Sequence, residues 1–340
     1  MRYRQLSLDE RYQIQALLRA HWSQSDIARG LGRAPSTISR ELARNADPRA
    51  AQPYLAMRAS KRTHRRRVEK GIASRKIRGA LKVLVERKLR LSWSPEQISG
   101  RLKFESCFNI SHETIYQHII RDTHEHRGYL RYCLRFGGYK HHRCKKSKHA
   151  ERTRARKNWI DARPADANER RTIGHWERDC IVGKPDSAAM LTMVDRKSRY
   201  TRLRRVSKLN TAEVGEATAN LLAPYRAINK TLTNDNGREF QRDNEMTKEI
   251  KIPIYFCDPA SPWQRGSVEN ANGLIRQYVR KGTDLAKLPD WVETAVEDTL
   301  NHRPRKILGY RTPHEVFYGQ SLNLIRKRAM HFGLEFSFDI

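Results

Sequence analysis

Residues 263–278 read WQRGSVENANGLIRQY, a stretch that predicts a loop running into a helix. Its apolar residues recur at steps of three and four, which indicates one buried stripe. They are Val268, Ala271, Ile275 and Tyr278. Gly266 relaxes the backbone at the start, and Ser267 is expected to cap the first turn. Glu269 lies beside the stripe, so we expect its carboxylate at the edge of the packed face.

A glutamate at that edge is either a metal ligand or an ordinary surface side chain. The ordinary interpretation pairs Glu269 with Arg265, four residues earlier, for roughly a few tenths of a kcal/mol. Other carboxylates in the chain, and the partner that the chain binds, decide between the two.

The composition indicates a polyanionic partner. The chain has 340 residues, enough for two or three domains, and its 68 Lys and Arg residues against 37 Asp and Glu residues leave a net charge of +31. Such a charge is self-repelling unless a polyanion binds. Nucleic acid is the expected partner, with an anionic membrane surface as the rival. No apolar run could span a bilayer, and the first residues lack the apolar core of a signal peptide. We therefore expect a cytoplasmic, nucleoid-associated protein that uses no membrane.

The five cysteines form no Cys-x-x-Cys pair, so we expect reduced thiols. A mixed group of His and Cys residues could hold zinc instead, but its spacing matches no zinc module and it lies among Lys and Arg residues. The group consists of His124, His126, Cys133, His141, His142, Cys144 and His149.

Residues 1–50 predict a three-helix domain. Ser7-Leu-Asp-Glu10 is a capping box, Ser23 caps a second helix over 24–31, and Pro35 opens a third that runs to Arg44. The last two helices, joined by a turn that contains Gly32, indicate a DNA-binding helix-turn-helix, and an ordinary helical bundle is the alternative. Their facing apolar residues are Ile27, Leu31, Ile38 and Leu42. The expected DNA contacts on the third helix are Ser36, Thr37, Arg40 and Arg44.

A second helical domain is expected at residues 74–125, after a basic linker at 51–73. The linker contains KRTHRRR at 61–67, which is expected to follow DNA phosphates, with a solvated helix face as the alternative. Helical spacing returns over 74–90, and Ser94 and Ser111 then begin two more helices of a second helix-turn-helix-like DNA-binding domain. Its candidate DNA contacts are His112, Thr114, Tyr116 and Gln117. A second basic linker is expected at 126–170, because 140–157 hold nine Lys or Arg residues and one acid.

After Gly174 the pattern changes from helices to strands. Strands are expected over 175–182, 188–194, 200–206, 230–233 and 252–257, with a helix over 211–223 and the Glu269 helix at the end. This order predicts an α/β domain of the ribonuclease H type over 171–325, with a mixed five-stranded sheet, before a tail at 326–340. The chain is therefore expected to be multidomain, with all-α helix-turn-helix domains followed by a catalytic α/β domain.

Three carboxylates are expected at one edge of that sheet. Asp179 is midway along the first strand, Asp235 directly follows the fourth, and Glu269 comes from a helix packed over the same edge. Together they repel one another unless cations lie among them. Two Mg²⁺ ions about 3.5–4 Å apart suit hard oxygen ligands and phosphoryl transfer, and Mn²⁺ can substitute. In so basic a chain, the phosphoryl group is expected to belong to DNA.

The sequence around these carboxylates resembles the Asp-Asp-Glu transposases and integrases. GHWERD at 174–179, TNDNGREF at 233–240 and the stretch at 263–278 are similar to motifs of the insertion-sequence thirty family of bacterial transposases. The likeness continues through NHRPRK at 301–306 and TPHE at 312–315, and includes the N-terminal helix-turn-helix. It implies an enzyme that binds terminal inverted repeats, cuts DNA with water as the nucleophile, joins the freed 3′-hydroxyl to target DNA, and works as a homo-oligomer.

The resemblance also selects among nearby acids. Glu177 shares a strand face with Asp179, and the family pattern is what makes Asp179 the first ligand. Asp195 is interpreted as a hairpin-turn residue. Neighbouring candidates for auxiliary roles with DNA or metal-bound water, or for turns, caps and packing, are Asn236, Trp263, Arg265, Asn270 and Arg276.

Two other functions are compatible with the same features. A DNA-binding regulator would use the helix-turn-helix units and carry an inert nuclease-like domain, although an inert domain has no need of three unpaired acids. A plain ribonuclease H-like nuclease would cut without joining, which leaves two sequence-reading modules unexplained.

Overall fold

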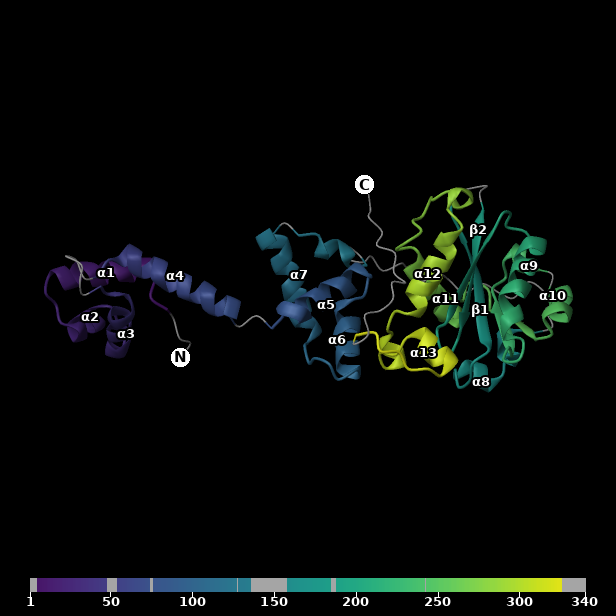
Figure 1. Ribbon diagram of the computed structural model, residues 1–340, viewed down its shortest axis with the longest axis horizontal. Coiled ribbons are helices and arrows are strands. Elements are labelled where there is room, and N and C mark those ends of the chain that lie inside the picture. The colour runs from purple at the N-terminus through teal and green to yellow at the C-terminus, as the bar shows by residue number, and fades with distance from the viewer. Residues whose placement is uncertain are drawn as a thin grey trace. The chain divides into compact units, whose positions relative to one another are not determined.

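The computed structural model describes residues 5–47, 54–73, 76–126, 128–135, 158–184, 188–241 and 243–325. The chain divides into two compact units, Met1–Lys76 and Ile77–Ile340. Figure 1 shows the helices and strands of each unit. The predicted tail at 326–340 and the whole basic stretch at 140–157 lie outside the described residues.

The N-terminal unit contains the three predicted helices. α1 (Leu8–Arg19) begins at the capping box, in which Ser7 and Glu10 each accept the other's backbone N–H. α2 (Gln24–Gly30) is capped by Ser23, and α3 (Pro35–Asn45) begins at a proline. Their apolar faces meet in one core, as predicted. This core includes Ile14, Ile27, Leu31, Ile38 and Leu42.

A fourth helix occupies most of the first predicted linker. The linker prediction for 51–73 is wrong over α4 (Ala56–Ala73), where Ala56 and Ala59 are buried and the helix packs on α1. The basic side chains take the other faces, which is the solvated-helix alternative. Arg62 and Arg66 donate to the backbone carbonyls of Asn45 and Arg44, at 3.0 and 2.9 Å. Two cations therefore stabilise the carboxyl end of α3.

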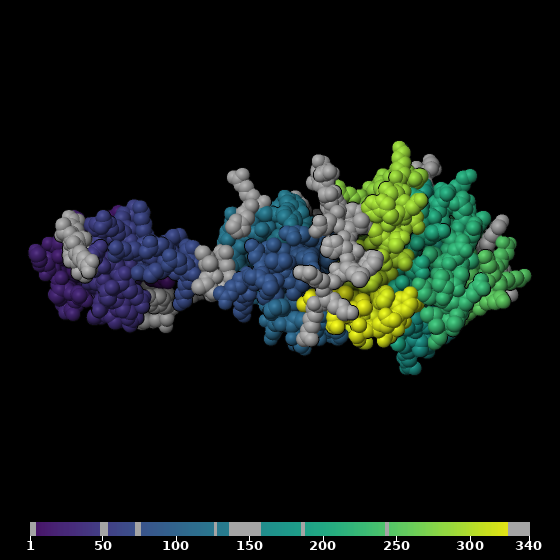
Figure 2. All heavy atoms as spheres, in the orientation of Figure 1, coloured from purple at the N-terminus to yellow at the C-terminus, as the bar shows by residue number. Residues whose placement is uncertain are grey.

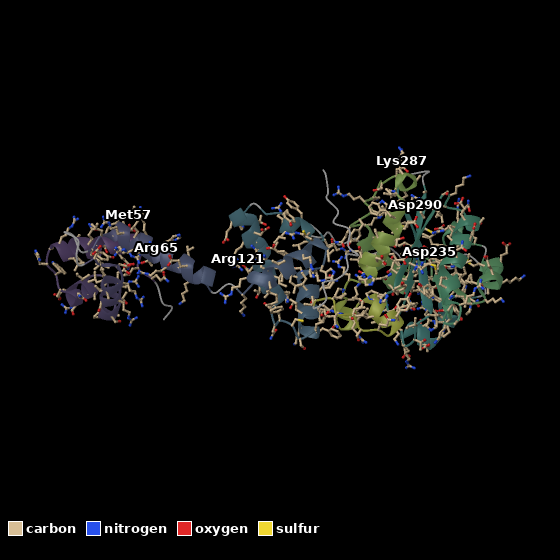
Figure 3. All side chains as sticks on the ribbon, in the orientation of Figure 1. Met57, Arg65, Arg121, Asp235, Lys287 and Asp290 are labelled. Carbon is tan, nitrogen blue, oxygen red and sulfur yellow. The ribbon has the colours of Figure 1, made fainter. Side chains whose placement is uncertain are left out.

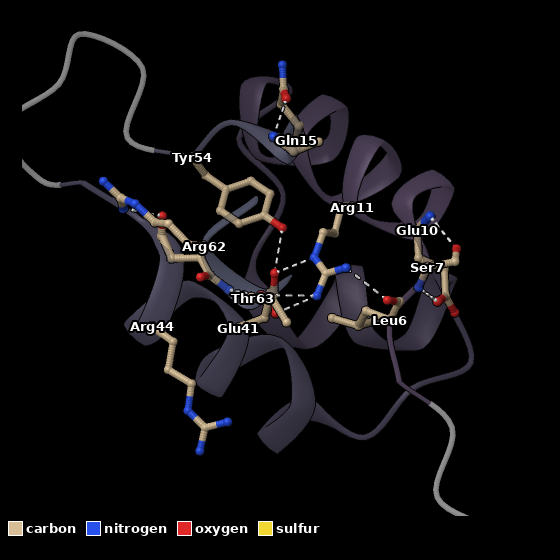
Figure 4. A network of polar contacts seen from close by, with 12 residues as sticks. Leu6, Ser7, Glu10, Arg11, Gln15, Glu41, Arg44, Tyr54, Arg62 and Thr63 are labelled. Carbon is tan, nitrogen blue, oxygen red and sulfur yellow. Dashed lines mark hydrogen bonds and ion pairs between the residues drawn. The ribbon is translucent and has the colours of Figure 1, made fainter. Parts of the chain in front are cut away.

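A buried polar network connects α1 with α3 (Figure 4). Arg11 Nε donates to Glu41 Oε1 at 2.8 Å, and the Tyr54 hydroxyl donates to the same oxygen at 3.1 Å. Arg11 also donates to the backbone carbonyl of Leu6 at 2.9 Å. Either charge alone would be buried without its partner, so the pair holds the two helices in one arrangement. Arg44 points away from this network (Figure 4).

The second helical domain begins the larger unit. It consists of α5 (Gly79–Arg90), α6 (Pro95–Phe104), α7 (His112–His126) and the 3₁₀ helix η1 (Leu130–Cys133). The predicted start at Ser94 is a complete capping box with Gln97. Leu130 is buried in the core of this domain. Residues 128–135 therefore belong to the domain rather than to the predicted linker at 126–170.

The predicted mixed sheet is confirmed. Its strands are β1 (His175–Val182), β2 (Ala189–Asp195), β3 (Thr201–Val206), β4 (Thr231–Asn234) and β5 (Ile254–Phe256). Their order is β3-β2-β1-β4-β5, with β1, β2 and β3 antiparallel and β4 and β5 parallel to β1. This is the arrangement expected of a ribonuclease H-like domain.

Helices cover both faces of the sheet (Figure 1). α9 (Thr211–Leu222) packs on one face with Trp176 of β1, and α11 (Gly266–Ile275) and α12 (Trp291–Asn301) pack on the other with Ile181. Of the helices that follow β3, α10 (Asp243–Ile250), α12 and α13 (Pro313–Tyr318) were not predicted. The short 3₁₀ helices are η3 (Ala223–Tyr225), η4 (Arg238–Phe240), η5 (Pro262–Arg265), η6 (Leu285–Lys287) and η7 (Lys306–Leu308).

The end of the second predicted linker also belongs to the sheet domain. Residues 158–170 form η2 (Ile160–Ala162) and α8 (Ala165–Asn168). Trp159 makes a parallel bridge with Phe256 of β5, and Arg163 donates to the hydroxyl of Thr233 at 3.2 Å. The linker prediction is wrong here because these residues find backbone and hydroxyl partners on the sheet.

An ion pair joins the second helical domain to the sheet domain. Arg101 of α6 has no exposed surface and donates to both carboxylate oxygens of Glu315 in α13, at 2.7 and 2.8 Å. Figure 2 shows the yellow segment around α13 against the blue helical domain. The two domains therefore form one unit. In the part of the chain described, no helix combines the length and the apolar character needed to span a membrane.

Candidate active site and DNA-contacting surfaces

The sheet register places Asp179 and Asp235 side by side. β1 and β4 pair in parallel with Glu177 opposite Thr233, and the same register two residues later puts Asp179 opposite Asp235. Asp179 accepts the backbone N–H of Cys180 at 2.9 Å, and Asp235 accepts that of Gly237 at 2.9 Å. Figure 3 labels Asp235 in the sheet domain.

Arg265 bridges the two aspartates. Its guanidinium group donates to Asp235 Oδ2 at 2.8 Å and lies 3.4 Å from Asp179 Oδ1. It also donates to the backbone carbonyl of Arg178 at 3.0 Å, and its side chain is only 8% exposed. The expected surface pair between Arg265 and Glu269 is not formed, because both of its ion pairs are with the aspartates. A cation is thus held where two carboxylates meet.

Glu177 is fully buried and holds the start of α11. Its Oε2 accepts the backbone N–H groups of Ser267 and Val268, both at 2.9 Å, and its Oε1 pairs with Arg196. The prediction that Ser267 caps α11 is wrong, since the Ser267 hydroxyl instead accepts from Arg199. Both carboxylate oxygens of Glu177 therefore have partners, one of them the first turn of α11. Glu177 thus has a structural role beside Asp179.

Glu269 lies in the first turn of α11 and is exposed. One turn later, Asn272 donates to Asp179 Oδ2 at 2.9 Å, which ties the helix to the first strand. Of the predicted stripe, Val268, Ala271 and Ile275 are buried, whereas Tyr278 is half-buried and lies past the end of α11.

The charges at this edge favour an added cation. Desolvation raises the pKa of Asp179, and the charge of Asp235 adds to the shift while Arg265 opposes it. Desolvation also raises the pKa of Glu269. The charge of Arg265 lowers this pKa, and the charge of Asp179 adds to the rise. Among the described residues, no three His, Cys, Asp or Glu side chains lie close enough to share a metal ion. Carboxylate oxygens are donors that suit a divalent metal, and in this structure Arg265 lies between the two aspartates.

Two family models match the chain. One, described as a helix-turn-helix domain, matches residues 2–45, and the other, described as an integrase core domain, matches residues 169–262. The second match includes Asp179 and Asp235 and ends before Glu269.

Curated relatives match over nearly the whole chain. The transposase for insertion sequence element IS1086 of Cupriavidus metallidurans is 38% identical over 93% of this chain and 94% of its own length. Transposase InsI for insertion sequence element IS30C of Escherichia coli is 38% identical over 92% of this chain and 82% of its own length. The chain belongs to the IS30 family of transposases. It has the integrase core that acts in DNA cleavage and strand transfer, and this core implies a divalent metal cofactor.

Solved structures give weaker similarities to the transposase. A chain of the simian T-cell lymphotropic virus intasome in complex with PP2A regulatory subunit B56 gamma has 19% identity and a TM-score of 0.37, covering 45% of this chain and 57% of its own. The catalytic core domain of BIV integrase has 19% identity and a TM-score of 0.34, and the match covers 43% of this chain and 94% of that domain's chain.

The other candidate auxiliary residues of the transposase have different surroundings. Asn236 donates to the backbone carbonyl of Cys257 at 2.8 Å, which holds the loop after β4. Arg276 donates to the carbonyl of Val182 at 2.7 Å, at the end of β1. Trp263 and Asn270 are exposed. Asp195 accepts the backbone N–H of Ser198 at 2.7 Å and closes the turn after β2, as interpreted.

The sequence analysis missed three polar residues near the aspartates. Asn272 could have been found from its position three residues after Glu269. Glu239 sits in η4 after Asp235, and desolvation together with Asp235 and Asp179 raises its pKa. Arg178 is buried on the opposite face of β1, where it donates to Asn234 Oδ1 at 2.7 Å and stacks on Phe240. No pattern along the chain marks the surroundings of Glu239 and Arg178, since these join different elements.

The N-terminal unit presents a basic groove beside α3. Of the predicted DNA contacts, Ser36, Arg40 and Arg44 are exposed and Thr37 is half-buried. Three of them line a groove of about 490 Å³ together with basic residues of α4. The basic residues of α4 are Arg66, Arg67 and Lys70. The helix that replaced the predicted linker thus extends the positive surface of α3.

The second helical domain presents α7 in a similar way. His112, Tyr116 and Gln117 are exposed, whereas Thr114 is half-buried with its hydroxyl 2.9 Å from that of Ser111. For the zinc alternative, His124 and Cys133 belong to no group of three or more His, Cys, Asp or Glu side chains among the described residues. The side chain of His126, and His141, His142, Cys144 and His149, lie outside the part of the chain that the structure describes.

Proposed function

We propose that Asp179, Asp235 and Glu269 are the catalytic carboxylates of this transposase and that they hold two Mg²⁺ ions, for which Mn²⁺ can substitute. The observation that carries the proposal is the Arg265 guanidinium group shared by Asp179 and Asp235, which marks the position where the protein needs positive charge. Carboxylate oxygens are the ligands that Mg²⁺ prefers.

Residues of the chain prepare this site in separate ways. Glu177 holds the first turn of α11, and so sets the position from which Glu269 extends. Asn272 orients Asp179 through its Oδ2, and Arg265 places positive charge between the two aspartates that would hold the metal. When bound, a pair of divalent metals supplies Lewis acidity for the attacking oxygen and stabilises the leaving oxygen in phosphoryl transfer.

We also propose a division of labour along the chain. The N-terminal unit reads the terminal inverted repeats with α3, where Ser36, Arg40 and Arg44 face solvent, and the second helical domain adds contacts through α7. Residues 171–325 carry out the reaction on the repeats and on target DNA. A homo-oligomer is needed to hold two ends at once, and the enzyme works on DNA in the nucleoid.

A strand-transfer assay tests this proposal. The protein is incubated with a labelled end of its own element and a plasmid, with Mg²⁺, with Mn²⁺ or with EDTA, beside the Glu269→Ala variant. We expect joined product only with a divalent metal and only with Glu269. Tight, specific binding without cutting or joining in any condition would instead support a DNA-binding regulator.

A further inference from the structure

A second polar cavity lies beside α11 and contains unneutralised arginines. Its volume is about 250 Å³, and none of its lining residues is acidic. Arg170, Arg199 and Arg305 reach it from three separate segments, and Ser267 and Asn270 reach it from α11. No carboxylate in the described part of the chain forms an ion pair with any of these three arginines. The cavity therefore presents cations and neutral hydrogen-bonding groups beside an apolar wall of Val194, Ala271, Leu274 and Ile307.

The cavity and the carboxylates lie on opposite flanks of the same helix. The α11 residues that line the cavity are Ser267, Asn270, Ala271 and Leu274. At about 100° per residue, Glu269 and Asn272 lie roughly 150° away from the centre of this group, on either side of the opposite flank. Asn272 bonds Asp179 there at 2.9 Å. The exposed ridge of α11 therefore separates the arginines from the catalytic carboxylates.

The three arginines have few partners. Arg305 donates to the backbone carbonyl of Leu300 at 3.2 Å and Arg199 to the hydroxyl of Ser267, whereas the Nε groups of Arg305 and Arg170 are buried with no partner. Burial and the neighbouring Arg303 lower the pKa of Arg305 to about 9, and burial and Arg170 lower that of Arg199 to about 10. Guanidinium groups stay charged in proteins, and Glu177 and Asp195 act on Arg199 without forming an ion pair with it. The positive charge of the cavity therefore has no carboxylate in direct contact among the described residues.

We propose that this cavity binds a phosphate of the DNA backbone and so fixes the strand that crosses α11 to the active site. Guanidinium groups bind phosphate through two parallel hydrogen bonds, and the Ser267 hydroxyl and Asn270 amide add neutral partners. A strand crossing the helix covers roughly 10 Å, the diameter of an α-helix, and so spans only a small number of nucleotides. The bound phosphate is thus a few nucleotides from the one that reacts. The inference rests on the proposed carboxylate site only for that spacing.

DNA binding by an Arg305→Gln variant tests the cavity without needing catalysis. All proteins carry Glu269→Ala and are assayed in EDTA with a duplex from the end of the element. Arg204→Gln is the control, because Arg204 is exposed on β3, outside the cavity, and its replacement removes the same charge. We expect Arg305→Gln to weaken binding about tenfold and to lower the slope of log K against log salt by about 0.9. Arg204→Gln is expected to keep the salt slope of the parent protein.

Single uncharged methylphosphonates in the duplex locate the contact. The parent protein is expected to lose affinity at one or two positions near the reacting phosphate, and Arg305→Gln to lose that sensitivity. Without DNA, the variant should melt at the same or a higher temperature than the parent, because it removes one of several repelling charges. A second variant, Arg199→Lys, is expected to show a smaller loss of affinity.

Three results would overturn the inference. Parent-like affinity, salt slope and methylphosphonate sensitivity in Arg305→Gln would show that the cavity takes no DNA phosphate. A lower melting temperature with unchanged methylphosphonate sensitivity would show a structural role. The third result is a parent protein that melts at a higher temperature with inorganic phosphate, while Arg305→Gln binds DNA as tightly as the parent does. It would assign the cavity to a free anion. Failure of strand transfer in the assay proposed above leaves these binding results unchanged, so the two proposals fail separately.

Discussion

Replacing Glu177 and replacing Asp179 are expected to have opposite consequences, although both side chains lie on the same face of β1. Glu177→Gln should destabilise the larger unit. Asp179→Asn should abolish DNA cleavage and joining with little change in stability. The contrast tests whether the structural and the catalytic acid of this strand have been assigned correctly.

The contacts give the size of each effect. A glutamine at 177 can keep one oxygen for the N–H groups of Ser267 and Val268, but it then turns an amide donor toward Arg196, which is 4% exposed. Breaking a buried ion pair from one side costs about 3–5 kcal/mol. Asn at 179 loses one hydrogen bond and the ion pair with Arg265, but it also removes a buried charge and its repulsion with Asp235, so we expect a change of less than about 1 kcal/mol.

Urea unfolding in EDTA measures both effects, and cleavage of a labelled element end with Mg²⁺ measures activity. Glu249→Gln serves as the control, because Glu249 is exposed on α10 and loses the same charge. Parent-like stability of Glu177→Gln together with lost activity would place Glu177 among the metal ligands. An Asp179→Asn variant as unstable as Glu177→Gln would mean that Asp179 is structural, and the reasoning would be refuted.

Three further predictions concern other parts of the transposase. Burial lowers the pKa of Lys88 to about 8, so above that pH only the unfolded chain keeps its proton. Between pH 8 and 9.5 the free energy of unfolding in urea should rise by about 2 kcal/mol more for the parent than for Lys88→Met. The same pH dependence of unfolding free energy in both proteins would contradict this. Arg101→Ala leaves Glu315 and Glu105 buried without their partner, so unfolding free energy should fall by about 3–5 kcal/mol; a loss below about 1 kcal/mol speaks against the interdomain pair. Arg44→Ala should weaken binding to the element end by about 1–3 kcal/mol at an unchanged melting temperature, and equal affinity in a titration removes Arg44 from the DNA contacts.

Local patterns in the sequence determined the elements of this protein. The strand-like composition of 175–182 and the alternation over 200–206 predicted β1 and β3 closely, and the Ser7 and Ser94 capping boxes predicted where α1 and α6 begin. These signals are local because a strand alternates its own side chains and a cap bonds its own first turn. The order of the strands was enough to predict the sheet that brings Asp179 beside Asp235.

The linkers were the main error, because composition alone cannot show which side of a basic segment is buried. α4 carries Lys and Arg on most of its surface, yet Ala56 and Ala59 are enough to pack it on α1. At 158–170, Trp159 and Arg163 have partners on strands that follow much later in the chain.

The sequence by itself determined the strands, the helices and the residue types of the carboxylate site. Tertiary structure decided what each charge does. Glu177 became a helix cap through residues 90 and 91 positions later, Arg265 joined an aspartate of β1 to the one that follows β4, and Arg101 met Glu315 across 214 positions. The arginine cavity likewise gathers three distant segments. From the sequence, a carboxylate near Asp179, such as Glu177, can be either a metal ligand or a helix cap. Its partners come from distant segments, so only the fold decides between the two roles.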